Sequence, residues 1–178
     1  MSNRKAKVLI VEDSAEAIYG YERNLQDKYR EDFDIAFVDS LITLDEMLYD
    51  DEGYKEYDAV AIDLNLEMPQ YTYDDLEDDI PEFGDAVAAG EKLPTELHGE
   101  IPLYGFDYFR LVIMARAETQ KMVEEGRIIL LSGHAAKLVK EKLFPLEARN
   151  CDTVTLIDRA DNSVENLRLK IMELANKR

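Results

Sequence analysis

Cysteine and long apolar runs are nearly absent from this chain. Its 178 residues contain one cysteine, Cys151, which cannot form an internal disulfide or a cysteine-rich metal site and is most simply a small residue ahead of a strand. No apolar run approaches the roughly 18 residues of a membrane-spanning helix. The first residues also lead into a strand without a cleavable apolar segment. We therefore expect a cytoplasmic protein with no membrane partner.

Positive charge is scarce as well. Lysine and arginine number 21 against 39 acidic residues, so the formal net charge is -18. A phosphate backbone or an anionic membrane would be repelled by such a surface, which excludes nucleic acid as a direct partner. Apolar residues make up 46% of the chain and charged residues 34%. These values and the length predict one domain over residues 1–178 with a full hydrophobic core.

Five short apolar runs have the length and composition of buried strands. They span residues 7–11, 34–38, 58–62, 127–131 and 153–157. Amphipathic helices are predicted between and after them, at residues 14–29, from 39 to about 48, at 105–125, at 135–148 and from 162 onwards. Because strands and helices alternate, we expect an α/β fold with a parallel sheet and right-handed crossovers.

Residues 67–103 depart from this alternation. They contain four of the five prolines, and eleven acidic residues against a single basic one, Lys92. Proline at this density does not continue a helix or a central strand, so the segment is predicted to be an inserted excursion. A short helix is expected around residues 85–92, and the acidic run at 74–79 is most simply a solvated surface.

Polar side chains follow four of the predicted strands. Glu12 and Asp13 end the first strand, Asp63 the third, Ser132 the fourth and Arg159 the fifth. The carboxyl ends of parallel strands meet at one edge of a sheet, where ligands bind. Three carboxylates there repel unless a cation joins them, and an all-oxygen ligand set suits Mg²⁺. A hydroxyl and a basic group suit an incoming phosphoryl group, so we expect Asp63 to form an acyl phosphate.

Taken together, four segments resemble the receiver domain of bacterial two-component response regulators. They are VLIVEDS at residues 8–14, DAVAIDLN at 58–65, IILLSGH at 128–134 and NSVENL at 162–167. The resemblance covers nearly the whole chain apart from the excursion. It implies a flavodoxin-like, doubly wound, five-stranded parallel sheet of order 2-1-3-4-5, with residues 67–103 inserted after the third strand.

The resemblance also implies a role for each matching residue. Asp63 matches the phosphoacceptor and Ser132 the hydroxyl that contacts the phosphoryl group. Asn65 and His134 match positions that tune the lifetime of the phosphoryl group. The implied Mg²⁺ ligands are Glu12, Asp13, Asp63 and the backbone carbonyl of Asn65.

Three features depart from the family pattern. The family has lysine after the fifth strand, whereas this chain has Arg159 beside Asp158, and a guanidinium fork differs from a compact ammonium. Leu156 stands where the family has an aromatic switch residue. The acidic excursion lengthens the loop after the phosphoacceptor, beside the active site.

The first hypothesis is a stand-alone response regulator that is not an enzyme in the usual sense. Asp63 would take a phosphoryl group from a histidine kinase or a phosphotransfer protein and thereby change binding to a downstream protein target. The family commonly dimerises through its fourth helix, fifth strand and fifth helix, which adds a homodimer to the implied partners. No output domain is expected after the last helix.

Two alternatives stay open. A receiver-like interaction domain that no longer switches would act through its surface and the excursion, and Arg159 and Leu156 favour it. A Mg²⁺-dependent phosphohydrolase with an aspartyl nucleophile fits poorly. Such enzymes place a second acid two residues after a nucleophile on the first strand, whereas here position 65 is Asn and Asp63 follows the third strand.

Overall fold

A five-stranded parallel sheet forms the centre of the protein. The structure, a computed structural model, describes residues 4–66, 76, 78–90, 104–133, 153–159 and 163–177. The strand order is β2-β1-β3-β4-β5 and every pairing is parallel, which confirms the predicted flavodoxin-like fold. The strands are β1 (Ala6–Val11), β2 (Phe33–Val38), β3 (Ala59–Asp63), β4 (Ile128–Ser132) and β5 (Thr155–Asp158).

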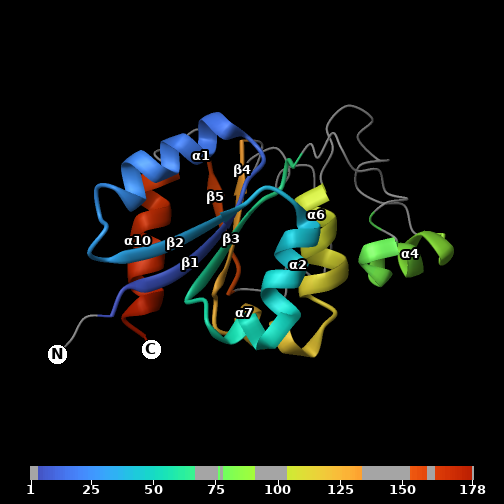
Figure 1. The fold of residues 1–178 in the computed structure, drawn as a ribbon. Coiled ribbons are helices and arrows are strands. Elements are labelled where there is room, and N and C mark those ends of the chain that lie inside the picture. Colours follow the sequence, from blue (N-terminus) through green and yellow to red (C-terminus); the bar gives the residue numbers. More distant parts are fainter. Residues whose placement is uncertain are drawn as a thin grey trace.

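Helices cover both faces of the sheet (Figure 1). One face carries α1 (Ala15–Tyr21), its π-helical continuation η1 (Glu22–Gln26) and α10 (Ser163–Ala175). The other face carries α2 (Leu41–Tyr49), α6 (Tyr104–Tyr108), the π-helical η3 (Phe109–Ile113) and α7 (Ala117–Glu124). A short η2 (Asp50–Lys55) follows α2, and α4 (Pro81–Ala88) lies outermost, beyond α6 in Figure 1.

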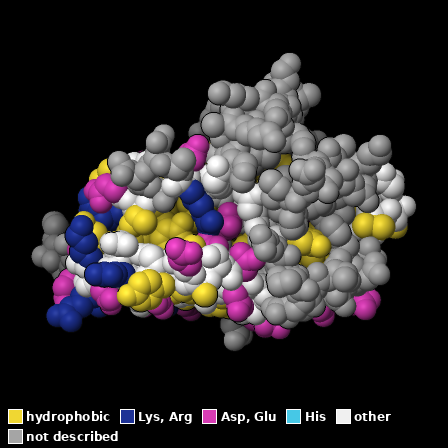
Figure 2. Space-filling view, turned by 90° about the horizontal axis from the view of Figure 1, so that it is seen from above, with side chains coloured by type: hydrophobic (Ala, Val, Ile, Leu, Met, Phe, Trp, Pro, Cys, Tyr) yellow, Lys and Arg dark blue, Asp and Glu magenta, His cyan; other side chains and the backbone are white. Residues whose placement is uncertain are grey.

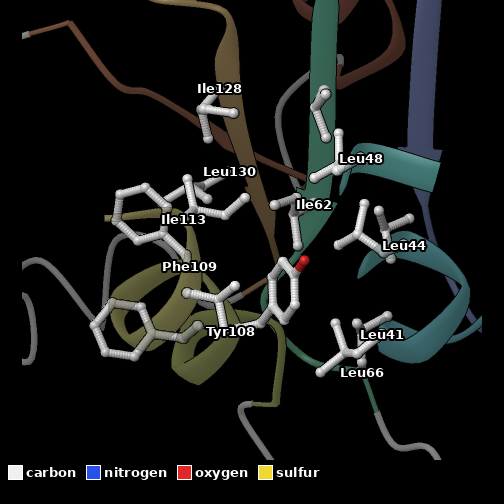
Figure 3. Packing of buried hydrophobic residues seen from close by; sticks show 14 of the residues in the cluster. Leu41, Leu44, Leu48, Ile62, Leu66, Tyr108, Phe109, Ile113, Ile128 and Leu130 are labelled. Carbon is white, nitrogen blue, oxygen red and sulfur yellow. The ribbon is translucent and has the colours of Figure 1, made fainter. Parts of the chain in front are cut away.

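The sheet separates two hydrophobic clusters. Because successive strand residues point to opposite faces, Leu9 of β1 packs with α2, η3 and α7, whereas Val8 and Ile10 pack with α1, η1 and α10. Figure 3 shows part of the first cluster, where Tyr108 lies between β3 and α2, and Phe109 lies beside Ile113 near β4. β1, β3 and β4 are buried almost throughout, as expected for strands covered on both faces.

Serine side chains open the helices that follow β1 and β2. Ser14 Oγ accepts a hydrogen bond from the Ala17 backbone N at 3.3 Å, and Ser40 Oγ accepts one from the Thr43 backbone N at 3.1 Å. Each satisfies a backbone donor that the first helical turn leaves free. The Ser14 cap therefore fixes where the chain leaves β1, immediately after Glu12 and Asp13.

The predicted helix boundaries need three corrections. The helix expected over 105–125 is broken at Met114–Arg116, where Arg116 has extended backbone angles of φ -80° and ψ 128°. The first helix was expected to reach Tyr29, but regular α-helix ends at Tyr21. The short helix expected at 85–92 runs over Pro81–Ala88 instead, because proline suits the first helical position.

The helix expected at 135–148 lies outside the described residues. Within the described part of the chain, no helix combines the length and apolarity needed to cross a bilayer.

Candidate functional site

Three carboxylates converge where β1 and β3 end. Glu12 and Asp13 directly follow β1, and Asp63 is the last residue of β3. Carboxylate oxygens of the three residues lie within 4.8 Å of one another. Glu12 and Asp63 are buried, whereas Asp13 is half-buried. Parallel pairing of β1 with β3 sets Val11 beside Ile62, which explains why their following residues meet.

Local hydrogen bonds orient two of these acids. Glu12 Oε1 accepts a hydrogen bond from the Ser14 backbone N at 3.1 Å. Asp63 Oδ1 accepts one from the Asn65 backbone N at 3.2 Å. The capping turn after β1 and the turn after β3 thus hold the carboxylates toward the same point.

Burial dominates the electrostatics of Asp63. Loss of water raises the pKa of its carboxyl from 3.8 to about 7, and the nearby negative charge of Asp13 acts in the same direction. The backbone hydrogen bond from Asn65 opposes this rise. A carboxylate in this environment gains from any cation that approaches it, whether a metal ion or a side chain.

Ser132 brings a hydroxyl to the same edge. It is the last residue of β4, is fully buried and follows Leu131, which pairs with Asp63. Its Oγ donates a hydrogen bond to Asn65 Oδ1 at 2.9 Å. The side chains at the ends of β3 and β4 are therefore joined through the Asn65 amide.

Arg159 supplies the positive charge. It follows β5, and its backbone N donates a hydrogen bond to the Ser132 carbonyl at 3.0 Å. Its guanidinium Nη2 forms an ion pair with Glu12 Oε2 and a second with Asp63 Oδ2 at 3.1 Å. Of the two neighbouring residues that could have faced the acids, Asp158 and Arg159, Arg159 reaches them. Figure 2 looks onto this edge and shows acidic and basic side chains side by side there.

The three carboxylates are suitable ligands for Mg²⁺. Glu12, Asp13 and Asp63 offer only oxygen atoms, and few protein ligands suffice because Mg²⁺ keeps several waters. Two of the three acids already pair with Arg159. A metal ion at this site would therefore share its ligands with an internal cation.

Gly105, which the sequence predicts only as the start of a helix, packs against the site. A Cβ atom at this position would lie 1.8 Å from the backbone carbonyl oxygen of Asp63, so any larger residue would collide with the end of β3. The first turn of α6 thus packs directly against the phosphoacceptor candidate. Nothing in the local sequence signals this contact, because it joins segments more than forty residues apart.

The predicted site residues fall into two groups. The structure brings six of them together, namely Glu12, Asp13, Asp63, Asn65, Ser132 and Arg159. His134 lies outside the described residues. Leu156, on β5, is half-buried and packs against the cluster that contains α2 and η3.

One solved structure with a similar fold is a response regulator receiver protein from Sinorhizobium medicae WSM419. Its TM-score is 0.50 at 16% sequence identity, over 97% of this chain and 96% of that chain. No protein-family model and no curated protein match the chain. At this identity the likeness concerns the fold, so the chain has the fold of a response regulator receiver domain.

Proposed function

We propose that this protein is a response regulator receiver in which Asp63 accepts a phosphoryl group in the presence of Mg²⁺. The observation that carries the proposal is the meeting of Glu12, Asp13 and Asp63, with oxygens within 4.8 Å of one another, beside Ser132 and Arg159. The donor is a histidine kinase or a phosphotransfer protein, and the output is altered binding to a protein target. In this proposal residues 67–103 are an insertion within a single receiver-like domain.

The chemistry assigned to Asp63 is nucleophilic. One of its oxygens attacks the phosphorus of a phosphohistidine, the P–N bond breaks, and the imidazole leaves with the bonding electron pair. Mg²⁺, held by Glu12, Asp13, Asp63 and the Asn65 carbonyl, would balance charge on the phosphoryl oxygens. The raised pKa of Asp63 means that a nearby positive charge favours the reactive carboxylate.

In this proposal, the Ser132 hydroxyl and the Arg159 guanidinium contact the phosphoryl oxygens. In the resting structure the Ser132 hydroxyl bonds Asn65 Oδ1 at 2.9 Å, and Arg159 pairs with Glu12 and Asp63. Phosphorylation then requires Ser132 to exchange the Asn65 amide for a phosphoryl oxygen. Asn65 would modulate the reaction through this competition, and His134 through its position two residues after Ser132.

The proposal is tested by incubating the protein with Mg²⁺ and acetyl phosphate and recording its intact mass. We expect an added phosphoryl mass that disappears when Mg²⁺ is chelated and in Asp63→Asn. Ser132→Ala should form the adduct more slowly while remaining folded. Unmodified wild-type protein under conditions in which Mg²⁺ binds would refute the assignment of Asp63.

The second candidate is a receiver-like interaction domain that does not switch. It is favoured by the Arg159 guanidinium, which already supplies Glu12 and Asp63 with a positive charge, and by Leu156 in place of an aromatic residue. In that case neither Mg²⁺ nor acetyl phosphate should alter the mass or the amide exchange of the protein. In a receiver that switches, Mg²⁺ should alter the amide exchange, and acetyl phosphate with Mg²⁺ should alter both the mass and the amide exchange.

A further inference from the structure

Helix α4, within the acidic excursion, is docked on the body of the protein. Phe83 and Ile80 are fully buried and belong to the same cluster as Phe109 and Ile113 of η3. The C-terminal end of the helix is exposed, including Val87, whose exposed fraction is 43%. α4 therefore covers apolar surface of η3 that would otherwise meet water.

Arg116 joins α4 to this body. Its Nε and Nη2 donate to the two carboxylate oxygens of Glu82 on α4, at 2.5 and 2.6 Å. Its Nη1 donates to both oxygens of Asp45 on α2, at 2.9 and 3.1 Å. One guanidinium thus spans two helices from distant parts of the sequence, and it does so from the break between η3 and α7.

The two acids differ in how they are held. Asp45 also accepts a hydrogen bond from the buried Tyr108 hydroxyl at 2.8 Å, and the Arg116 guanidinium lies 4.1 Å from the centre of the Tyr49 ring. Among the described side chains, Arg116 is the partner that holds the Glu82 carboxylate, through this fork pair. If Glu82 moves away, Arg116 keeps Asp45 and Tyr49, so the guanidinium does not lose all of its partners.

The break between η3 and α7 lies at Arg116 itself. An uninterrupted helix over 105–125 would give Arg116 helical backbone angles, whereas it is extended and ends η3 before α7 begins. Thr119 Oγ1 bonds the Ile113 carbonyl at 2.8 Å, which satisfies an acceptor that the break leaves free. The break and the two ion pairs therefore form one local arrangement.

We propose that Arg116 and Glu82 form a releasable clasp, through which α4 opens and closes over η3 while the rest of the domain stays folded. Asp45, Tyr49 and Tyr108 hold Arg116 in place as the fixed half of the clasp. The burial of Phe83 and Ile80 keeps the closed form dominant, and the Glu82 pair sets how rarely it opens. This inference is independent of phosphorylation at Asp63.

Hydrogen exchange of the full chain, read by mass spectrometry, tests the clasp. In Glu82→Gln we expect protection in α4 to fall by about tenfold, the change that about 1.4 kcal/mol produces, because a charge-assisted fork pair is lost. Protection in β1, β3 and β4 should not change. Asp45→Asn, which disturbs the fixed half, should lower protection in α2 and η3 as well.

Glu165→Gln is the matched control. Arg168 forms the same fork pair with Glu165, at 3.0 and 2.6 Å, and lies 4.9 Å from the centre of the Tyr29 ring, but both partners belong to α10. This control should leave α4 protection unchanged. The proposal is overturned if Glu82→Gln leaves α4 exchange as in wild type. It is also overturned if α4 and the strands lose protection together, or if Glu82→Gln prevents folding, since α4 would then be an inseparable part of the fold.

Discussion

Replacing Asp63 with asparagine should change the pH dependence of stability in a defined way. Burial raises the pKa of the Asp63 carboxyl from 3.8 to about 7, so the folded state holds a proton that the unfolded state releases. A raised carboxyl pKa lowers stability as pH rises from the unfolded pKa to the folded one. Between pH 5 and pH 8 this amounts to about 2 to 3 kcal/mol, at about 1.4 kcal/mol per unit.

Asp63→Asn removes this titration and keeps the shape of the side chain. Its stability advantage over wild type should therefore grow by about 2 kcal/mol from pH 5 to pH 8, somewhat below the full value because Arg159 pairs with Asp63 at 3.1 Å. The assay is urea unfolding followed by circular dichroism, with EDTA to exclude divalent cations. Parallel pH profiles for the two proteins would show that Asp63 is solvated, and would contradict the burial argument.

Three other substitutions probe the site and its support. Gly105→Ala should destabilise the protein by about 1 to 3 kcal/mol, because its Cβ would collide with the Asp63 carbonyl. The control Gly20→Ala in α1 should stabilise the protein by about 0.5 to 1 kcal/mol. Equal unfolding free energies for the two variants in urea would refute the contact. Arg159→Gln should tighten Mg²⁺ binding by about tenfold in calorimetry because Glu12 and Asp63 lose their internal cation, and unchanged affinity would refute this competition. Phe109→Ala should cost about 3 to 5 kcal/mol of unfolding free energy, and a loss below about 1 kcal/mol would contradict its place in the core.

The strands could be predicted because short apolar, β-branched runs leave a direct record in the sequence. The runs expected at 34–38 and 127–131 correspond to β2 (Phe33–Val38) and β4 (Ile128–Ser132), within one residue at each end. The polar residues after the strands were equally readable, since parallel pairing puts their carboxyl ends at one edge. The meeting of Glu12 with Asp63 follows from this rule together with the strand order, which puts β1 beside β3.

The helix break and the clasp could not be predicted, because they depend on contacts between distant segments. Arg116 lies on a helical pattern, and only its pairing with Asp45 and Glu82 distinguishes it from a surface arginine. Gly105 could not be predicted either, because only the nearby Asp63 carbonyl requires a residue without a side chain at that position. Local periodicity records which face of a helix is buried, but not which distant residue stops the helix.

The role of Arg159 could be predicted only in part from the sequence. Its position after the fifth strand predicted a basic group at the edge, and the structure adds that the guanidinium pairs with Glu12 and Asp63. That geometry could not be read from composition or spacing. If Mg²⁺ binds as proposed, Arg159 competes with it for Glu12 and Asp63.

In the proposed function, the phosphoryl group resides on Asp63. An acyl phosphate is reduced by borohydride to an alcohol, so treatment of the acetyl phosphate-modified protein followed by peptide sequencing in the mass spectrometer locates the modified residue. We predict homoserine at position 63 in the Mg²⁺-treated wild-type protein and none in the sample without Mg²⁺. An adduct that resists borohydride, or a reduced residue at any other position, would contradict it.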